Sequence, residues 1–368
     1  RGMHVDTLAE KGIEYLMEQY AEATLEWALS QFGELEIEVP SWGFGRGGNR
    51  FATYVDGSEP TDLEGRLREA GRLYERTKQG QRVALHFPWD GNGPEDAERI
   101  SKLLQKYNLR PGAINSNLFS PRPDSRLNYE LRLGSLTHPD AEVRTAAVQH
   151  HLDCLEIGRR LGSGLLSIWI PDGSNSPGQT SLYDQADWLE TSLREIYDHL
   201  QPGEKLLLEY KFFEPGLYST AVPDWGRALT LCEELGPQAA VLVDLGHHPL
   251  GTNIEQIVAL LLRRGRLGGF HINDKKYADD DLAAGSIDPA QLFRIFVVIL
   301  EGVKRGYSTV ADISFTIDQS HCIKNPTEEL AESIENIEIA FLKACLVDYE
   351  ALSIARRSKE ISLADRIL

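Results

Sequence analysis

The chain has 368 residues, of which 42% are hydrophobic and 26% are charged. This composition supports a large buried core and excludes a disordered protein. The 38 basic and 56 acidic side chains give a net charge of −18, which argues against nucleic acid as a partner. No apolar run approaches 18 residues, so no membrane span is expected.

The cysteines are widely spaced and form no C-x-x-C pair. They are Cys154, Cys232, Cys322 and Cys345. Neither a disulfide framework nor a structural zinc site is therefore expected, and a reducing cytoplasm is the expected location.

The N-terminal region predicts helix followed by a first strand. Residues 5–32 carry apolar side chains at helical spacing and stop at Gly33, a residue that commonly ends helices. An apolar strand is expected at 35–40.

A glycine-rich loop follows this strand, and Gly43, Gly45 and Gly48 satisfy G-x-G-x-x-G. A dinucleotide-binding loop needs a helix that opens on these glycines, and the following residues predict irregular or extended chain instead. The loop also carries three aromatic side chains: Trp42, Phe44 and Phe51. They are compatible both with a mobile aromatic lid and with ordinary surface packing.

From Thr61 onward, helices and buried strands alternate. Helices are predicted at 61–78, 94–107, 139–162, 180–200, 224–236, 253–265 and 288–305, and strands at 83–90, 112–117, 164–175, 205–215, 239–248, 267–274 and 308–321. Together with 35–40 this makes eight strands, a pattern that indicates an α/β protein with a (β/α)₈ TIM barrel. We expect residues 1–345 to form the catalytic barrel, including an N-terminal helix, and 346–368 to form a C-terminal helical extension.

Polar residues gather where the predicted strands end, which in such a barrel is the side that carries the reactive groups. They are His86 and Trp89, Asn115, Trp169 and Asp172, Glu209 and Lys211, Asp244 and His247, His271, and Asp318 with Ser320. We expect these side chains to converge on one mouth.

The segment from Val243 to Asp281 has the densest set of possible metal ligands: Asp244, His247, His271, Asp279 and Asp281. A single Asp or His at a strand end is more often a helix cap or a satisfied polar residue. Five within one βαβ unit instead predict a metal centre. Mixed carboxylate and imidazole ligands suit Mn²⁺, Co²⁺, Mg²⁺ or Zn²⁺.

Glu209 and Lys211 lie two residues apart on a predicted strand, so both side chains point to the same face. An isolated pair of this kind is usually a plain salt bridge. Near the other ligands, a functional role is the better interpretation.

Nine segments now form a recognisable series. They are VPSWGFGRGGNRF, LHFPWD, NSN, SIWIPDGSN, LEYK, VDLGHH, GGFHIND, DDD and IDQSH. In this order the sequence resembles the bacterial L-rhamnose isomerases of the broad-specificity type, which also accept D-allose and belong to the xylose-isomerase-like superfamily. The resemblance runs from about Val39 to Pro326.

This resemblance implies two divalent metal ions per subunit, most plausibly Mn²⁺. One would be held by Glu209, Asp244, His271 and Asp318, and the other by His247, Asp279 and Asp281, with Glu209 bridging. The implied reaction is aldose to ketose, L-rhamnose to L-rhamnulose, with side activity on sugars such as D-allose and D-psicose.

The resemblance also implies roles for the reacting groups. Lys211 would donate to O1, and a water molecule backed by Asp318 would move a proton between O1 and O2 while hydride passes from C2 to C1. An ene-diol route remains an alternative. His86 would bind a sugar hydroxyl or assist ring opening. Aromatic walls would come from Trp42, Trp89 and Trp169, and Phe51 would reach a neighbouring subunit's site in a homotetramer.

Other functions remain to be weighed. A ketose 3-epimerase on the same barrel typically uses two opposed carboxylates at a single metal, and the larger ligand set favours the isomerase. A metal-dependent DNA-repair nuclease would need a basic groove, which a chain at −18 lacks. A catalytically idle sugar-binding protein would not need Lys211 beside Glu209. The residues do not fix the physiological sugar, the native metal or the oligomeric state.

Overall fold

The computed structural model describes residues 2–45, 47–48, 53–54, 60–118, 131–214, 218–320 and 323–368. Within them, eight parallel strands close into a barrel: β1 (Ile37–Pro40), β4 (Arg82–Phe87), β5 (Arg110–Ser116), β6 (Leu165–Trp169), β7 (Lys205–Glu209), β10 (Ala239–Asp244), β11 (Leu267–Ile272) and β12 (Ser314–Ile317). Each strand pairs with the next barrel strand along the chain, and β12 pairs with β1. The predicted (β/α)₈ barrel is confirmed.

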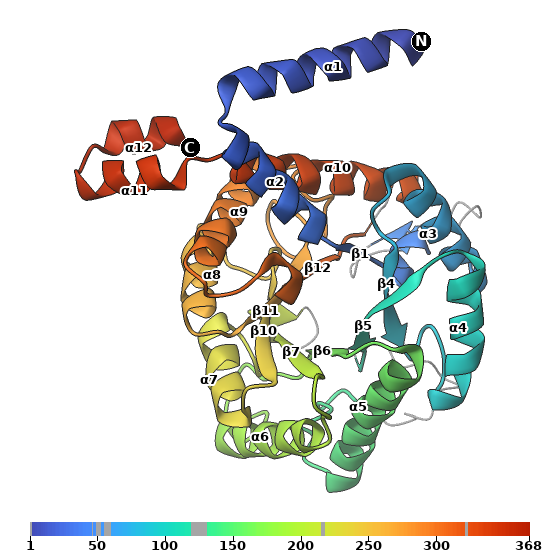
Figure 1. Cartoon of the computed structure of the whole chain (residues 1–368). Coiled ribbons are helices and arrows are strands. Elements are labelled where there is room, and N and C mark those ends of the chain that lie inside the picture. Colours follow the sequence, from blue (N-terminus) through green and yellow to red (C-terminus); the bar gives the residue numbers. More distant parts are fainter. Residues whose placement is uncertain are drawn as a thin grey trace.

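A ring of helices surrounds the barrel (Figure 1). It consists of α3 (Leu63–Thr77), α4 (Ala97–Lys106), α5 (Ala141–Leu161), α6 (Leu182–Asp198), α7 (Trp225–Leu235), α8 (Ile254–Arg263), α9 (Pro289–Lys304) and α10 (Pro326–Cys345). Most of these helices begin at a side chain that accepts a hydrogen bond from the first turn. These capping residues are Asp62, Asp140, Ser181, Asp224, Asn253, Asp288 and Asn325. Short polar caps of this kind fix helix starts, which explains why the predicted boundaries lie close to the observed ones.

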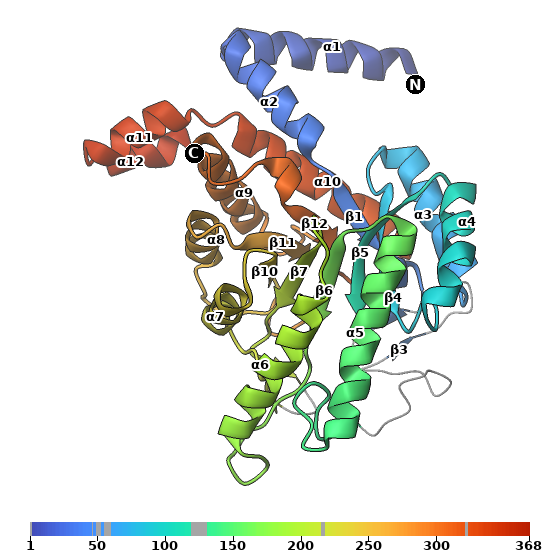
Figure 2. The ribbon, with the colours of Figure 1, turned by 60° about the horizontal axis from the view of Figure 1, so that its bottom comes forward.

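The remaining helices lie at the end of the barrel where the strands begin (Figure 2). They are α1 (Gly2–Gln19), α2 (Glu22–Glu34), α11 (Tyr349–Arg357) and α12 (Ile361–Ile367). The Lys304 ammonium of α9 lies 3.8 Å from the centre of the Trp27 ring of α2, a cation–π contact that joins α2 to the ring of helices. Among the residues described, no helix has the length and hydropathy that crossing a membrane requires.

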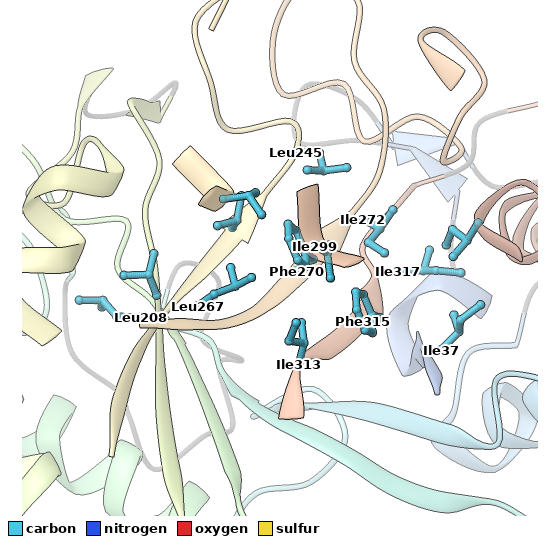
Figure 3. Close-up of a cluster of buried hydrophobic side chains, with 14 of the residues drawn as sticks. Ile37, Leu208, Leu245, Leu267, Phe270, Ile272, Ile299, Ile313, Phe315 and Ile317 are labelled. Atoms are coloured by element: carbon cyan, nitrogen blue, oxygen red, sulfur yellow. The ribbon is translucent and has the colours of Figure 1, made fainter. Parts of the chain in front are cut away.

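The main core lies between the strands and the helices. Figure 3 shows part of it, where Phe270 of β11 and Phe315 of β12 stack with ring centres 5.9 Å apart, near Ile272 and Ile317. These four side chains are at most 2% exposed. Because alternate residues of a strand face opposite sides, the residues between them face the inside of the barrel.

On the inner side of β7 and β10, a second, smaller apolar cluster is formed by Leu207, Ala240 and Leu242. Two residues beyond Leu207 and Leu242 come Glu209 and Asp244, each the last residue of its strand. The alternation therefore carries both carboxylates to the inner face, above an apolar floor.

Most of the observed barrel strands are shorter than predicted, three of them by six residues or more. The strand at 164–175 ends at Trp169, and the strand at 308–321 begins only at Ser314, after the 3-10 helix η3 (Val310–Asp312). The strand at 205–215 ends at Glu209, and an antiparallel hairpin of β8 (Phe213–Glu214) and β9 (Tyr218–Ser219) follows.

The glycine-rich segment after β1 contains the 3-10 helix η1 (Ser41–Phe44), then β2 (Gly47–Gly48) and β3 (Thr53–Tyr54), which pair antiparallel. As expected, no helix opens on these glycines within the described residues. Phe51 lies outside the described residues.

Candidate metal centre

Four side chains from four neighbouring strands meet at the mouth of the barrel. Glu209, Asp244, His271 and Asp318 each offer a ligand atom, and these atoms all lie within 4.8 Å of one another. The strand register explains the convergence: Asp244 pairs directly with His271, and the Asp318 amide donates to the carbonyl of Ile272.

The distances within this group suit a divalent cation. His271 Nδ1 lies 3.1 Å from Glu209 Oε1, 3.4 Å from Asp318 Oδ2 and 3.9 Å from Asp244 Oδ2. Ligand atoms bound at about 2.0–2.3 Å from one ion lie roughly 3–4.5 Å from each other. The spacing and the donor types therefore fit a metal ion bound between these side chains.

His247 and Asp279 continue the cluster on the far side of Glu209. His247 Nδ1 lies 3.1 Å from Glu209 Oε1, and its Nε2 lies 3.1 Å from Asp279 Oδ1. The backbone of Asp281 adopts a left-handed conformation (φ 49°), and its carbonyl accepts from the Ser320 amide, which places this loop beside the end of β12. A second cation at His247, Asp279 and Asp281 remains a prediction.

Burial and mutual charge shift the proton affinities of the group. Burial, with help from Glu209 and Asp318, raises the pKa of Asp244 to about 7. Burial alone would lower the pKa of His271, but the nearby Glu209 and Asp318 outweigh it and raise that pKa to about 9. Carboxylates and imidazoles here share protons that a divalent cation would replace.

Asn273 supports the ligands, and the sequence interpretation did not single it out. Its Nδ2 donates to both Asp244 carboxylate oxygens, at 3.1 and 3.2 Å, and to the Asp318 carbonyl at 3.0 Å. The Gly246 amide donates to Asp244 Oδ1 at 2.7 Å. Asn273 could have been found from its position two residues after His271, because residues at that spacing on a strand face the same side.

Lys211 lies next to this cluster and is fully buried. Its Nζ is 2.6 Å from Glu214 Oε2 and 2.6 Å from Asp279 Oδ2. The ammonium also lies 5.1 Å from the centre of the Trp169 ring and 5.9 Å from that of Phe213. The expected approach of Lys211 and Trp169 to the barrel mouth agrees with this placement, whereas Glu214 was missed because it follows the strand in a hairpin.

His86 lies in a row of aromatic rings. It stacks on Trp89, with ring centres 5.7 Å apart and an interplanar angle of 17°, and meets Trp42 edge-on at 6.3 Å. Burial lowers the pKa of His86 to about 4, so the ring is neutral at pH 7. No described residue hydrogen-bonds its Nδ1, and this atom is buried.

Asp90 holds this row in place. Its carboxylate accepts from Ser41 Oγ at 2.5 Å, from the His86 amide at 2.8 Å and from the Arg66 guanidinium at 2.8 Å. The carboxylate therefore joins the exits of β1 and β4.

Asp172 is a correction to the expected convergence. Its carboxylate accepts four hydrogen bonds of 2.7–2.9 Å from the amides and hydroxyls of Ser135 and Thr137. It thus anchors the loop before α5, because those groups satisfy its oxygens. Strand-end position alone did not separate this use from a role in the site.

The structure is a closed parallel barrel with a cluster of carboxylates and imidazoles at the carboxyl ends of its strands. These two features define the class of protein as a TIM barrel with a candidate metal centre. The chain belongs to the Xylose isomerase-like TIM barrel family, whose sequence profile matches residues 73–339. It is similar to a protein named as a probable sugar isomerase from Mesorhizobium japonicum, with 42% identity over 86% of this chain and 72% of that protein. A second protein of that description, from Rhizobium meliloti, is 37% identical over 99% of this chain and 81% of its own length.

Among solved structures, an L-ribulose 3-epimerase matches with a TM-score of 0.56 and 17% identity, over 89% of this chain and 97% of that one. At this identity the likeness shows the fold.

Proposed function

We propose that this protein is a divalent-metal-dependent aldose–ketose isomerase, with L-rhamnose as the first substrate to test. The observation that carries the proposal is the cluster of Glu209, Asp244, His271 and Asp318 at the mouth of a barrel of this family. The relatives named as probable sugar isomerases support the same reaction class.

In this proposal, Glu209 joins the two ligand groups, because His271 and His247 both lie 3.1 Å from its Oε1. When bound, the cations would act as Lewis acids that polarise the sugar's carbonyl and hydroxyl oxygens. The side chain of Asp318 is 22% exposed and is the most accessible of the four ligands. In this proposal Asp318 would hold the water molecule that moves a proton between O1 and O2.

Lys211 and His86 would orient the open-chain sugar. The Lys211 ammonium would donate to O1, and the ring of neutral His86 would hydrogen-bond a sugar hydroxyl or assist ring opening. The faces of Trp42, Trp89 and Trp169 would line the C–H surfaces of the sugar. The role of Phe51 at a neighbouring subunit stays part of the proposal, as does a homotetramer.

The ketose 3-epimerase is the second candidate, because one four-ligand metal centre on this fold would also serve it, and the solved 3-epimerase shares the fold. The two reactions differ in the carbon that changes. An isomerase interconverts C1 and C2, whereas a 3-epimerase inverts C3 of a ketose.

The test is to incubate metal-free enzyme with L-rhamnose, D-allose or D-psicose, with and without Mn²⁺, and to follow the products by NMR in D₂O. We expect ketose from L-rhamnose only after Mn²⁺ is added, and loss of turnover on chelation. Direct hydride transfer keeps the migrating hydrogen, whereas an ene-diol route introduces solvent deuterium. Exclusive inversion at C3 would support the epimerase, and no turnover of any aldose by the loaded enzyme would refute the isomerase.

A further inference from the structure

The Lys211 ammonium is a buried charge held by two carboxylates at equal distance. Glu214 Oε2 and Asp279 Oδ2 both lie 2.6 Å from Nζ, and all three side chains are at most 1% exposed. A buried ammonium without a carboxylate partner is strongly destabilised, so at least one of these partners must stay with it.

The two carboxylates are in different situations. Asp279 Oδ1 also lies 3.1 Å from His247 Nε2, in the group proposed to hold the second cation. A divalent ion bound by Asp279 would withdraw that carboxylate's charge from Lys211 and repel the ammonium. Glu214 is outside the proposed ligand set, so it is the partner that can remain with Lys211.

The backbone ties Glu214 and Lys211 into one unit. Glu214 lies on β8, opposite Tyr218 of β9. The Lys211 amide donates to the Val222 carbonyl at 3.0 Å, and the Thr220 hydroxyl donates to the Lys211 carbonyl. The hairpin thus returns to Lys211 and fixes the distance between the ammonium and Glu214.

The rings of Trp169 and Phe213 also lie near the ammonium, with their centres 5.1 and 5.9 Å from Nζ. Their faces favour a cation, yet they supply no hydrogen-bond acceptor comparable to a carboxylate. Among the described contacts, the two carboxylates are therefore the ones that orient the N–H groups of Lys211.

We propose that Glu214 is a positioning residue that holds the Lys211 ammonium in the barrel mouth and away from Asp279 when Asp279 binds a cation. This inference rests on the proposed function, in which Lys211 donates a hydrogen bond to O1 of the sugar. Lys211 and the second cation compete for the Asp279 carboxylate. Glu214 favours binding of the cation, because it offers Lys211 another carboxylate.

The test is a double-mutant cycle with Glu214→Gln, Lys211→Met and the double variant. Two quantities are measured for each: the Kd of the weaker Mn²⁺ equivalent, by calorimetry on metal-free protein, and kcat with KM. Glu214→Gln leaves Lys211 with Asp279 as its remaining carboxylate partner, so we expect the weaker Mn²⁺ Kd to rise about tenfold and kcat to fall about tenfold, with KM within about threefold.

In the Lys211→Met background, we expect Glu214→Gln to change neither quantity, because the residue through which it acts is gone. Glu190→Gln is the matched control, since Glu190 pairs with Arg227 at 2.7 Å on the outside of the barrel. It should match the parent protein in both quantities.

Equal effects of Glu214→Gln in the parent and Lys211→Met backgrounds would overturn the proposal and show that Glu214 only braces the hairpin. An unchanged Mn²⁺ Kd in Glu214→Gln would overturn it as well. If the parent enzyme binds Mn²⁺ but isomerises no aldose, the proposed function fails, while the calorimetric cycle still tests the link between Glu214 and Lys211.

Discussion

The two ends of the barrel both bury carboxylates, but they treat them differently. At the end where the strands begin, Glu38 is 2% exposed and is matched by a cation and by donors: Arg82 Nε at 2.8 Å, the Ala113 amide at 3.0 Å and the Thr316 hydroxyl at 3.2 Å. Its oxygens are satisfied by the chain itself.

At the mouth, Glu209, Asp244 and Asp318 crowd each other and two histidines. Burial, followed by Glu209 and Asp318, raises the pKa of Asp244, while His247 lowers it. The comparison teaches that a buried acid is structural where the fold pairs it with a permanent cation, and suggests a metal ligand where the fold brings several acids and histidines together.

Among the substitutions at either end of the barrel, Glu209→Gln should have the largest effect, which is on activity. It keeps the side-chain shape but removes the charge that joins the two ligand groups, so we expect isomerase activity at saturating Mn²⁺ to fall at least about 1000-fold. Steady-state assays and circular dichroism check this. An activity loss below tenfold in a folded, metal-loaded variant would contradict the assigned role.

The two ends should also differ in stability. Glu38→Ala strands the Ala113 amide and Arg82, and we expect it to lower the free energy of unfolding by about 3 kcal/mol. Asp244→Asn should cost less than about 1 kcal/mol in metal-free protein at pH 6, because a carboxyl with a pKa of about 7 is already largely protonated there.

Urea denaturation of chelator-treated protein measures both values. Glu36→Ala is the control for Glu38, since Glu36 is exposed at the same end of the barrel and should change the stability little. A larger loss in Asp244→Asn than in Glu38→Ala would reverse the comparison.

A further effect concerns acid stability outside the ligand cluster. His150 of α5 bonds the Phe87 carbonyl at 3.2 Å, beside His151 and near Asp153. Burial lowers its pKa to about 4, below the unfolded value of about 6.5. The unfolded chain therefore takes up this proton first, so the stability contribution is complete above pH 6.5 and declines as the pH falls toward 4, by about 3 kcal/mol.

His150→Gln should flatten this part of the profile of unfolding free energy against pH, measured on chelator-treated protein. Exposed His199 provides the control, and His199→Gln should keep the parent slope. If the slope of unfolding free energy against pH is unchanged in His150→Gln, groups other than His150 cause the loss of stability in acid.

The sequence by itself determined the barrel, and its resemblance to a known family singled out the four ligands of the cluster. Strand and helix periodicity predicted the number and order of the elements, because these signals are local. Once the strands are parallel and consecutive, residues that end them, such as Glu209 and Asp244, must share one mouth.

Only the tertiary structure decided how the remaining polar groups are used. Glu214 meets Lys211, three residues before it, because β7 ends at Glu209 and the chain then enters the β8 strand, whereas Asp172 bonds the loop before α5. Both outcomes depend on the path of the chain after a barrel strand ends, and residue type and spacing did not reveal that path. The physical reason is that a buried polar atom bonds the nearest suitable partner in space, which the order of residues along the chain does not specify.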